Sequence, residues 1–230
     1  MPETGVRHAW DLTPREAARL QLELAGKVRT DLALGTVRRV AGADIAYSKI
    51  TGRSYAAVCV LSFPGLQLLE TVTFSGPTPF PYVPGLLSFR EVPILLEAFG
   101  RLSSPPDLVL VDGHGFAHPR RFGIACHFGL WLGLPTVGVA KSRLCGAYEE
   151  PGPERGDWSP LTDGDEVLGA VLRTRRAVRP VFVSIGYGIP LEVCIDWVLR
   201  LCSRYRLPEP VRRADALAEQ VKRAAEGRTG

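Results

Sequence analysis

The chain has 230 residues, of which 46% are hydrophobic and 23% charged, so it can bury a sizeable core and is not a disordered protein. Its net charge of +4 permits nucleic-acid binding without requiring it. Five cysteines without a CxxC pair, no signal peptide and no membrane span favour a cytoplasmic protein with free thiols over a disulfide framework, a structural zinc site or a membrane protein.

The first predicted element is a helix that starts after Thr13. Thr13 fits the N-cap, Pro14 the first helical position and Glu16 the partner residue of a capping box. An amphipathic run follows, and it predicts a helix that continues to about Leu34 and is closed by Gly35.

Three strand-like runs come next, at residues 37–47, 55–63 and 66–74. Their connections, residues 49–54 and 64–65, are short. Short connections join antiparallel neighbours, so we expect these strands to form a meander.

Residues 76–84 form a Pro-rich loop, after which an apolar helical period returns near residues 88–102. The short apolar run at 107–112 is typical of a buried parallel strand. A turn rich in Gly and His then leads into a helix near 121–132 and a second buried strand at 136–140.

Residues 147–165 are polar and rich in Gly and Pro, which indicates an excursion outside the core. Strands at 167–173 and 181–185 follow, and then helices near 191–205 and 211–225.

This order of elements is the plan of an α/β, ribonuclease H-like fold, a mixed β-sheet flanked by helices. Order alone does not exclude other α/β folds. The sequence contains no internal repeat and no linker, so we expect one domain over residues 1–230.

Two acids occupy positions where a buried strand should be apolar. Asp44 lies in the middle of the first predicted strand, where an unpaired carboxylate is costly and a divalent cation is one compensating partner. Asp112 ends the fourth strand, and ligands gather beyond the carboxyl ends of the strands in an open sheet. If these strands are neighbours, both carboxylates can face one ion.

Two helical acids extend this set. Glu91 lies at the start of a helix and Asp215 on the last one. Strand and helix carboxylates together would make an oxygen-only site suited to Mg²⁺ or Mn²⁺, the ions that assist phosphodiester hydrolysis.

Each acid also has an ordinary structural interpretation. Asp44 is equally compatible with an ion pair to an Arg, and Asp112 before a Gly is typical of a turn. Glu91 lies three residues after Ser88 and fits a capping box, and Asp215 fits a solvated helix face. The joint placement, and no single residue, favours the metal site.

Histidines 114, 118 and 127 and Cys126 lie close together in the sequence, which raises a zinc site. Zinc ligands need paired spacings, and neither CxxC nor HExxH is present, so zinc is disfavoured. Gly113-His-Gly115 lacks the GKS/T or GxGxxG of a nucleotide-binding loop.

Five blocks resemble the endonuclease V family and stand in the family order: residues 40–47 (VAGADIAY), 81–91 (PYVPGLLSFRE), 112–120 (DGHGFAHPR), 137–144 (VGVAKSRL) and 205–212 (YRLPEPVR). The resemblance implies a Mg²⁺-dependent DNA repair endonuclease, with Mn²⁺ as a substitute ion. It would act on damaged, inosine-containing DNA and hydrolyse the second phosphodiester bond 3′ to the lesion. We expect a monomer, although no feature of the sequence decides the oligomeric state. The product is a nick with a 3′-hydroxyl and a 5′-phosphate.

The resemblance also implies roles for the acids and one lysine. Asp44 and Asp112 match the family's metal-binding pair, and Glu91 completes that site. Lys141 matches the active-site lysine, and Asp215 lies where the family has His or Asp.

The same resemblance assigns a wedge and a base pocket. The wedge that fills the gap left by a displaced base is Pro81, Tyr82, Val83 and Pro84. The pocket residues are Gly85, Leu87, Gly113, Gly115, Gly123 and Ile124, with His118 near the base or backbone. Pro-stiffened loops, a stacking Tyr and close backbone approach at glycines suit an everted base.

The chain departs from the family at Ile185 and Tyr187, which replace Pro and His, so no role of that His is carried over. Two alternatives stay open: an endoribonuclease acting on inosine-containing RNA, and a binding module without catalysis. Retention of the acids argues against the second.

Overall fold

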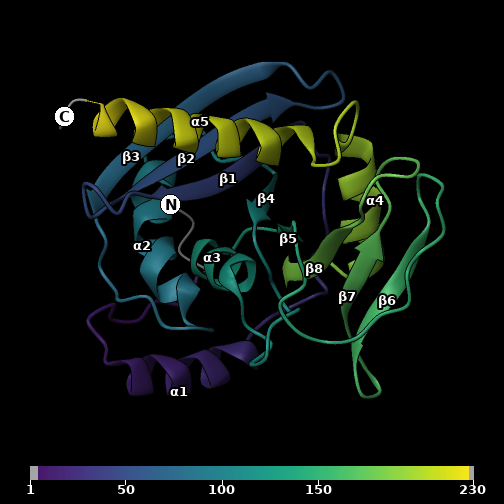
Figure 1. Ribbon diagram of the computed structural model, residues 1–230, viewed down its shortest axis with the longest axis horizontal. Helices are drawn as coiled ribbons and strands as arrows, with labels where there is room; N and C mark the ends of the chain where they lie inside the picture. The colour runs from purple at the N-terminus through teal and green to yellow at the C-terminus, as the bar shows by residue number, and fades with distance from the viewer. Residues whose placement is uncertain (1–4, 228–230) are drawn as a thin grey trace.

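A computed structural model describes residues 5–227 and arranges eight strands in one mixed sheet (Figure 1). The strands lie in the order β3-β2-β1-β4-β5-β8-β7-β6. They are β1 Arg39–Tyr47, β2 Arg53–Ser62, β3 Leu68–Pro77, β4 Leu108–Asp112, β5 Thr136–Ala140, β6 Trp158–Asp163, β7 Glu166–Leu172 and β8 Val181–Tyr187. Strand β4 runs parallel to β1 and to β5, and the other neighbouring pairs are antiparallel.

The predicted ribonuclease H-like plan is confirmed. Strands β1, β2 and β3 form the expected antiparallel meander, and β4 is the parallel neighbour of β1. The flanking helices are α1 Pro14–Ala25, α2 Leu87–Phe99, α3 Ile124–Leu132, α4 Leu191–Leu201 and α5 Glu209–Glu226.

Helices cover both faces of the sheet, and alternation along the strands decides which residues meet which helix. Helices α4 and α5 pack on one face, against side chains such as Val40 and Leu110. Helices α2 and α3 pack on the other face, against Ala41 and Val109. In Figure 1, α5 crosses the meander strands on the side opposite to α2. Even-numbered residues of β1 and β4 therefore face α5, and odd-numbered residues face α2.

The predicted length of the first helix is wrong, although both bonds of its capping box form. Helix α1 ends at Ala25 and does not reach Leu34. The following segment pairs instead with the end of β8: Leu32 N donates to Gly188 O at 2.8 Å, and Gly188 N donates to Arg29 O at 2.7 Å. These tertiary hydrogen bonds pair backbone N–H and C=O groups that would otherwise have been paired within a longer helix.

The interpretation of residues 147–165 as an excursion outside the core is also wrong, because this segment contains strand β6. Strand β6 pairs with β7 at the edge of the sheet, and Ala147 bridges to Thr162. An edge strand needs partners on one side only, so it tolerates polar residues and Pro160.

Two later helices are shorter than the sequence predicts. Helix α3 starts at Ile124 because Arg121 adopts a left-handed backbone conformation with φ 56°, and α4 ends before Cys202, which is extended. Within residues 5–227, no helix has both the length and the apolar character needed to cross a membrane.

Candidate active site

Asp44 and Asp112 lie side by side at the carboxyl ends of two neighbouring parallel strands. Ala43 of β1 pairs with Val111 of β4, and each acid is the next residue along its strand. Because both acids occupy even-numbered positions, they share the sheet face that α5 covers. The structure thus brings together the pair that the sequence indicates.

Helix α5 brings Asp215 to this pair. The helix crosses β1 at Gly42, where a Cβ would lie only 2.1 Å from the backbone carbon and oxygen of Pro210. Only a residue without a side chain permits this approach. Asp215 follows five positions after Pro210, and single carboxylate oxygens of the three aspartates lie within 4.8 Å of one another.

Lys141 lies just beyond the end of β5 and contacts two of these carboxylates. Its Nζ is 2.6 Å from Asp112 Oδ2 and 2.7 Å from Asp215 Oδ1. The backbone at Lys141 is held by Arg206, whose Nη2 donates to Lys141 O at 2.6 Å and to Pro180 O at 2.7 Å. The ammonium therefore has a fixed place beside the acids.

Burial and mutual repulsion perturb the acids. Burial, with the charge of Asp112, raises the pKa of Asp44 to about 8. Burial also raises the pKa of Asp112, although the hydrogen bond and charge of Lys141 oppose the rise. Burial lowers the pKa of Lys141, but its contacts with Asp112 and Asp215 outweigh this and raise it overall. Three carboxylates share one ammonium, so the cluster is short of positive charge.

The donor set suits a hard divalent cation. All three close ligands are carboxylates, the ligand type that Mg²⁺ and Mn²⁺ prefer. Asp112 Oδ2 is buried, and its neighbouring cation is the Lys141 ammonium at 2.6 Å. A cation among these oxygens would supply the missing positive charge.

Glu91 is outside the group of three. It belongs to α2, which packs on the opposite face of the sheet, and its carboxylate is not among the ligand atoms that lie within 4.8 Å of one another. Burial raises its pKa to about 8, opposed by Arg90 and reinforced by the charge of Asp112. The capping-box interpretation is wrong, because Ser88 lies inside the helix and bonds His127 instead.

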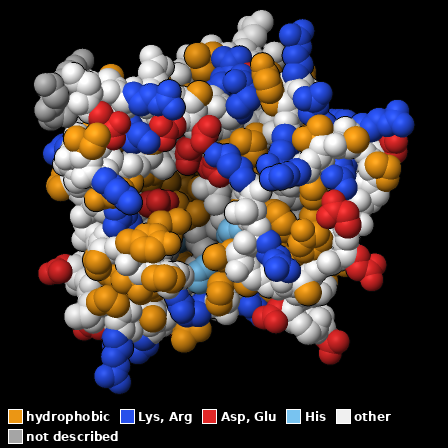
Figure 2. Space-filling view, viewed as in Figure 1, with side chains coloured by type: hydrophobic (Ala, Val, Ile, Leu, Met, Phe, Trp, Pro, Cys, Tyr) orange, Lys and Arg blue, Asp and Glu red, His pale blue; other side chains and the backbone are white. Residues whose placement is uncertain are grey.

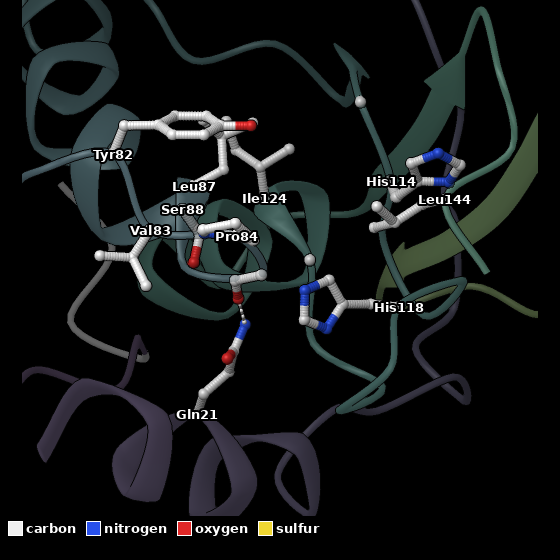
Figure 3. A pocket seen from close by; sticks show the side chains of 13 residues that line it. Gln21, Tyr82, Val83, Pro84, Leu87, Ser88, His114, His118, Ile124 and Leu144 are labelled. Carbon is white, nitrogen blue, oxygen red and sulfur yellow. Dashed lines mark hydrogen bonds between the residues drawn. The ribbon is translucent and has the colours of Figure 1, made fainter. Parts of the chain in front are cut away.

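A cavity of about 210 Å³ adjoins the acids, because its wall includes Gly113, the residue after Asp112. Figure 2 shows this side of the molecule hollowed near its centre, with hydrophobic side chains around the hollow and histidines at its edge. The lining residues are Gln21, Tyr82, Val83, Pro84, Gly85, Leu87, Ser88, Gly113, His114, His118, Gly123, Ile124 and Leu144 (Figure 3).

Most residues predicted for wedge and pocket line this cavity, but Pro81 and Gly115 do not. Gly115 has a packing role instead: its N donates to Ser184 Oγ at 2.9 Å, and a Cβ would lie 2.0 Å from Ile185 O. Gly115 therefore serves close packing between this turn and β8.

Sequence reasoning missed Gln21, Ser88, His114 and Leu144 among the lining residues. His114 and Leu144 fall inside recognised blocks, and Ser88 lies inside the second block, so position within a block was an available signal. Gln21 has no such signal, because it lies on α1, outside every block.

Burial keeps the cavity histidine neutral. His118 lines the cavity, is 4% exposed and accepts a hydrogen bond at Nδ1 from Arg120 N at 3.1 Å. Burial, with the charge of Arg120, lowers the pKa of His118 to about 4. Burial also lowers the pKa of His114, the second histidine that lines the cavity, so the cavity presents no charged imidazole at neutral pH.

His127 is engaged on both ring nitrogens. Its Nδ1 lies 3.0 Å from Ser88 Oγ and its Nε2 lies 2.7 Å from His8 Nε2. No nitrogen is left for a metal ion, and within residues 5–227 the three aspartates are the one group of three or more potential ligands that lies close together.

Tyr82 stands out from the protein. It is 73% exposed, while Phe80 and Leu86 on either side of it are buried at 4% and 3%. The loop is thus anchored at both ends and presents Tyr82 to solvent at the mouth of the cavity (Figure 3).

The two departures from the family lie away from the acids. Tyr187 is buried in an apolar cluster with Leu24 and Phe122, and Ile185 is partly buried and packs against the core cluster that includes residues of α4 and α5. Both side chains serve packing.

Comparisons with known proteins show which family this sequence and fold resemble. The sequence profile of the endonuclease V family matches residues 22–216. Endonuclease V of Dehalococcoides mccartyi is 50% identical over 93% of this chain and 96% of that protein. The crystal structure of endonuclease V from Streptomyces avermitilis is similar with a TM-score of 0.90 at 43% identity, covering 96% of this chain and 98% of that one. Endonuclease V of Ciona intestinalis was solved in complex with a 24mer DNA containing an inosine followed by a ribo-adenosine. That structure is similar with a TM-score of 0.80 at 28% identity, covering 92% of this chain and 98% of that one.

Proposed function

This chain belongs to the endonuclease V family, and from that premise we propose that it is a DNA repair nuclease that recognises deoxyinosine. We propose that it hydrolyses the second phosphodiester bond 3′ to the lesion and leaves a 3′-hydroxyl and a 5′-phosphate. One observation carries the proposal: the cluster of three aspartates lies directly beside a cavity that no charged side chain lines. The two are joined by the peptide between Asp112, which belongs to the cluster, and Gly113, which lines the cavity.

Asp44, Asp112 and Asp215 are the residues that would hold Mg²⁺, or Mn²⁺ in its place. When bound, such an ion lowers the pKa of water and stabilises negative charge on a phosphate. We also include Glu91 among the proposed metal ligands. It comes from the helix on the opposite face of the sheet, and it is near enough to Asp112 for the charge of that residue to raise its pKa. Lys141 keeps its proton at working pH and supplies a fixed positive charge for the phosphate oxygens.

The cavity suits a single everted base. Its volume of about 210 Å³ lies below the roughly 300–1,000 Å³ of drug-sized sites, so it admits a base without its sugar and phosphate. Hypoxanthine is neutral, and a neutral His118 avoids attracting a charged group in its place. Tyr82 is placed to stack on the bases beside the gap that an everted nucleotide leaves.

A second candidate is cleavage of inosine-containing RNA. The Ciona intestinalis relative was solved with a DNA in which a ribonucleotide follows the inosine, so a 2′-hydroxyl is accommodated next to the lesion in that protein. The acids would serve either backbone equally.

The test incubates the purified chain and Mg²⁺ with end-labelled duplexes that differ only in one inosine, and with a matched RNA. We expect a single cut in the inosine DNA, one nucleotide beyond the bond next to the lesion on its 3′ side. Release of free base, or equal cutting of the undamaged duplex, contradicts the proposal. Faster cutting of the RNA selects the second candidate.

We also propose that residues 1–230 act as one domain, supported by the continuous sheet of residues 5–227. A monomeric state stays a prediction, which sedimentation at working concentration tests.

A further inference from the structure

Gln21 of α1 is buried to 1% exposure, and its amide group is fully bonded. Its Nε2 donates to Gly85 O at 3.1 Å and to Phe122 O at 2.6 Å, and its Oε1 accepts from Arg120 Nε. Figure 3 shows the side chain reaching from α1 to the cavity, with its bond to the Gly85 carbonyl. A buried amide is expected to be bonded, but here every partner belongs to the cavity wall or to the residues next to it.

The bonded groups belong to two different walls. Gly85 lies in the loop that carries Tyr82, and Phe122 directly precedes Gly123, which lines the cavity from the segment before α3. Arg120 strengthens the link, because its Nη2 also donates to Gly85 O at 2.7 Å. One amide and one guanidinium therefore tie the two walls together.

This link is separate from the contacts that dock α1. Ala17 packs with Phe80 and Leu86, and Leu24 packs with Phe122, one turn before and one turn after Gln21. Those apolar contacts keep the helix in place when the amide is altered. The hydrogen bonds instead fix the spacing between two loops, which would otherwise move more freely than the strands.

We propose that Gln21 is a positioning residue that sets the width of the base cavity and so determines how well inosine is distinguished from ordinary purines. The inference rests on the proposed function. Hypoxanthine differs from guanine by one amino group, so selectivity needs walls held at a fixed separation. Gln21 touches no reacting group and acts through the carbonyls of Gly85 and Phe122.

The experiment measures steady-state nicking of inosine duplex and of undamaged duplex by the whole chain with Mg²⁺. Gln21→Met keeps side-chain length and removes all three bonds. We expect KM for the inosine duplex to rise about tenfold with kcat within about twofold, because the acids lie on β1, β4 and α5. Preference for inosine over undamaged duplex falls by the same factor. Gln220→Met, at an exposed glutamine of α5, is the matched control and is expected to behave as wild type.

The KM–kcat split separates positioning from simple instability. Partial unfolding lowers the active fraction, and with it kcat, but leaves KM unchanged, so a Gln21→Met variant that loses only kcat overturns the inference. Gln21→Glu is expected to match or exceed the KM defect, because a carboxylate oxygen then faces the carbonyls of Gly85 and Phe122. If Gln21→Met does not fold, Arg120→Lys, which breaks the bond to Oε1, takes its place, and an unchanged KM overturns the inference.

A wild-type chain that leaves inosine duplex intact overturns the proposed function and this inference with it. A wild-type chain that nicks, with a Gln21→Met variant of normal KM and normal preference, overturns this inference alone.

Discussion

The acid cluster and the cavity beside it are built in different ways. The cluster consists of charged side chains on strand ends and one helix, and repulsion among Asp44, Asp112 and Asp215 leaves it in need of a cation. The cavity consists largely of loop backbone and apolar side chains, with a histidine that burial keeps neutral. Both regions meet at the peptide between Asp112 and Gly113.

This contrast indicates that bond cleavage depends on electrostatic interactions, whereas base recognition depends on the shape of the cavity. The cluster works through charge, so it should fail when one carboxylate is neutralised even if the fold is intact. The cavity works through shape, so it should fail when atoms are added to its backbone even if no charge changes. The following predictions test that separation in order of expected effect.

The largest effect is expected at the cluster. Asp112→Asn keeps the shape of the side chain but removes its charge, and we expect nicking to fall by on the order of 10³-fold or more while binding to inosine duplex persists. Single-turnover nicking and a binding titration measure the two quantities. Asp196→Asn, at a half-exposed acid of α4, is the control. Unchanged nicking by Asp112→Asn would refute the assignment of the cluster.

The next largest effect is expected from adding one methyl group to the cavity wall. A Cβ at Gly123 would lie 2.2 Å from His114 O and 2.8 Å from Gly115 O, so the two backbones must separate. We expect Gly123→Ala to lower the free energy of unfolding by roughly 1–3 kcal/mol and to weaken inosine binding. Thermal denaturation and binding titration measure both. Gly35→Ala has open space around it and should match wild type; equal behaviour of the two variants would contradict the shape argument.

A smaller and more selective effect is expected at Tyr82. Because the ring is 73% exposed, Tyr82→Ala should change the free energy of unfolding by no more than about 0.5 kcal/mol. Stacking is worth about 1–3 kcal/mol per base, so we expect roughly tenfold weaker discrimination between inosine and undamaged duplex. Competition binding with the two duplexes measures it. An equal loss of affinity for both would argue against a wedge.

The smallest effect concerns pH and the neutral histidines. Burial lowers the pKa of His127 well below its ordinary 6.5 in the folded chain, so below about pH 6.5 the unfolded chain takes up a proton that the folded chain does not. The histidine therefore contributes a loss of stability as the pH falls from 7 toward 5, whereas the raised pKa values of Asp44 and Glu91 contribute in the opposite direction. His118, His114 and His8, whose pKa values are also lowered by burial, add to the loss.

Denaturant midpoints of wild type and His127→Gln between pH 7 and 5 test this. As the pH falls from 7 to 5, we expect the stability of the variant relative to wild type to increase, because one of the four histidine protonation sites is gone. A stability difference that does not change with pH would mean that His127 is accessible to protons in the folded chain.

The sequence by itself determined the two strand aspartates, the wedge loop and the plan of the sheet. Asp44 and Asp112 are visible because a carboxylate within or at the end of a buried strand is anomalous against its own neighbours, whatever the rest of the chain does. Tyr82 was indicated by the resemblance of residues 81–91 to a block of the endonuclease V family. Such signals are local in the sequence.

Tertiary structure alone decided which helical acid joins the pair, where α1 ends and what Gln21 does. Asp44 and Asp112 both occupy even-numbered strand positions, which face α5. Asp215 of α5 therefore belongs to the group of three close carboxylates, and Glu91 of α2, on the other face of the sheet, does not. Gln21 gains its partners 64 and 101 residues along the chain. Contacts at such separations depend on how faces pack, and a pattern confined to one element carries no information about the face that another element will present.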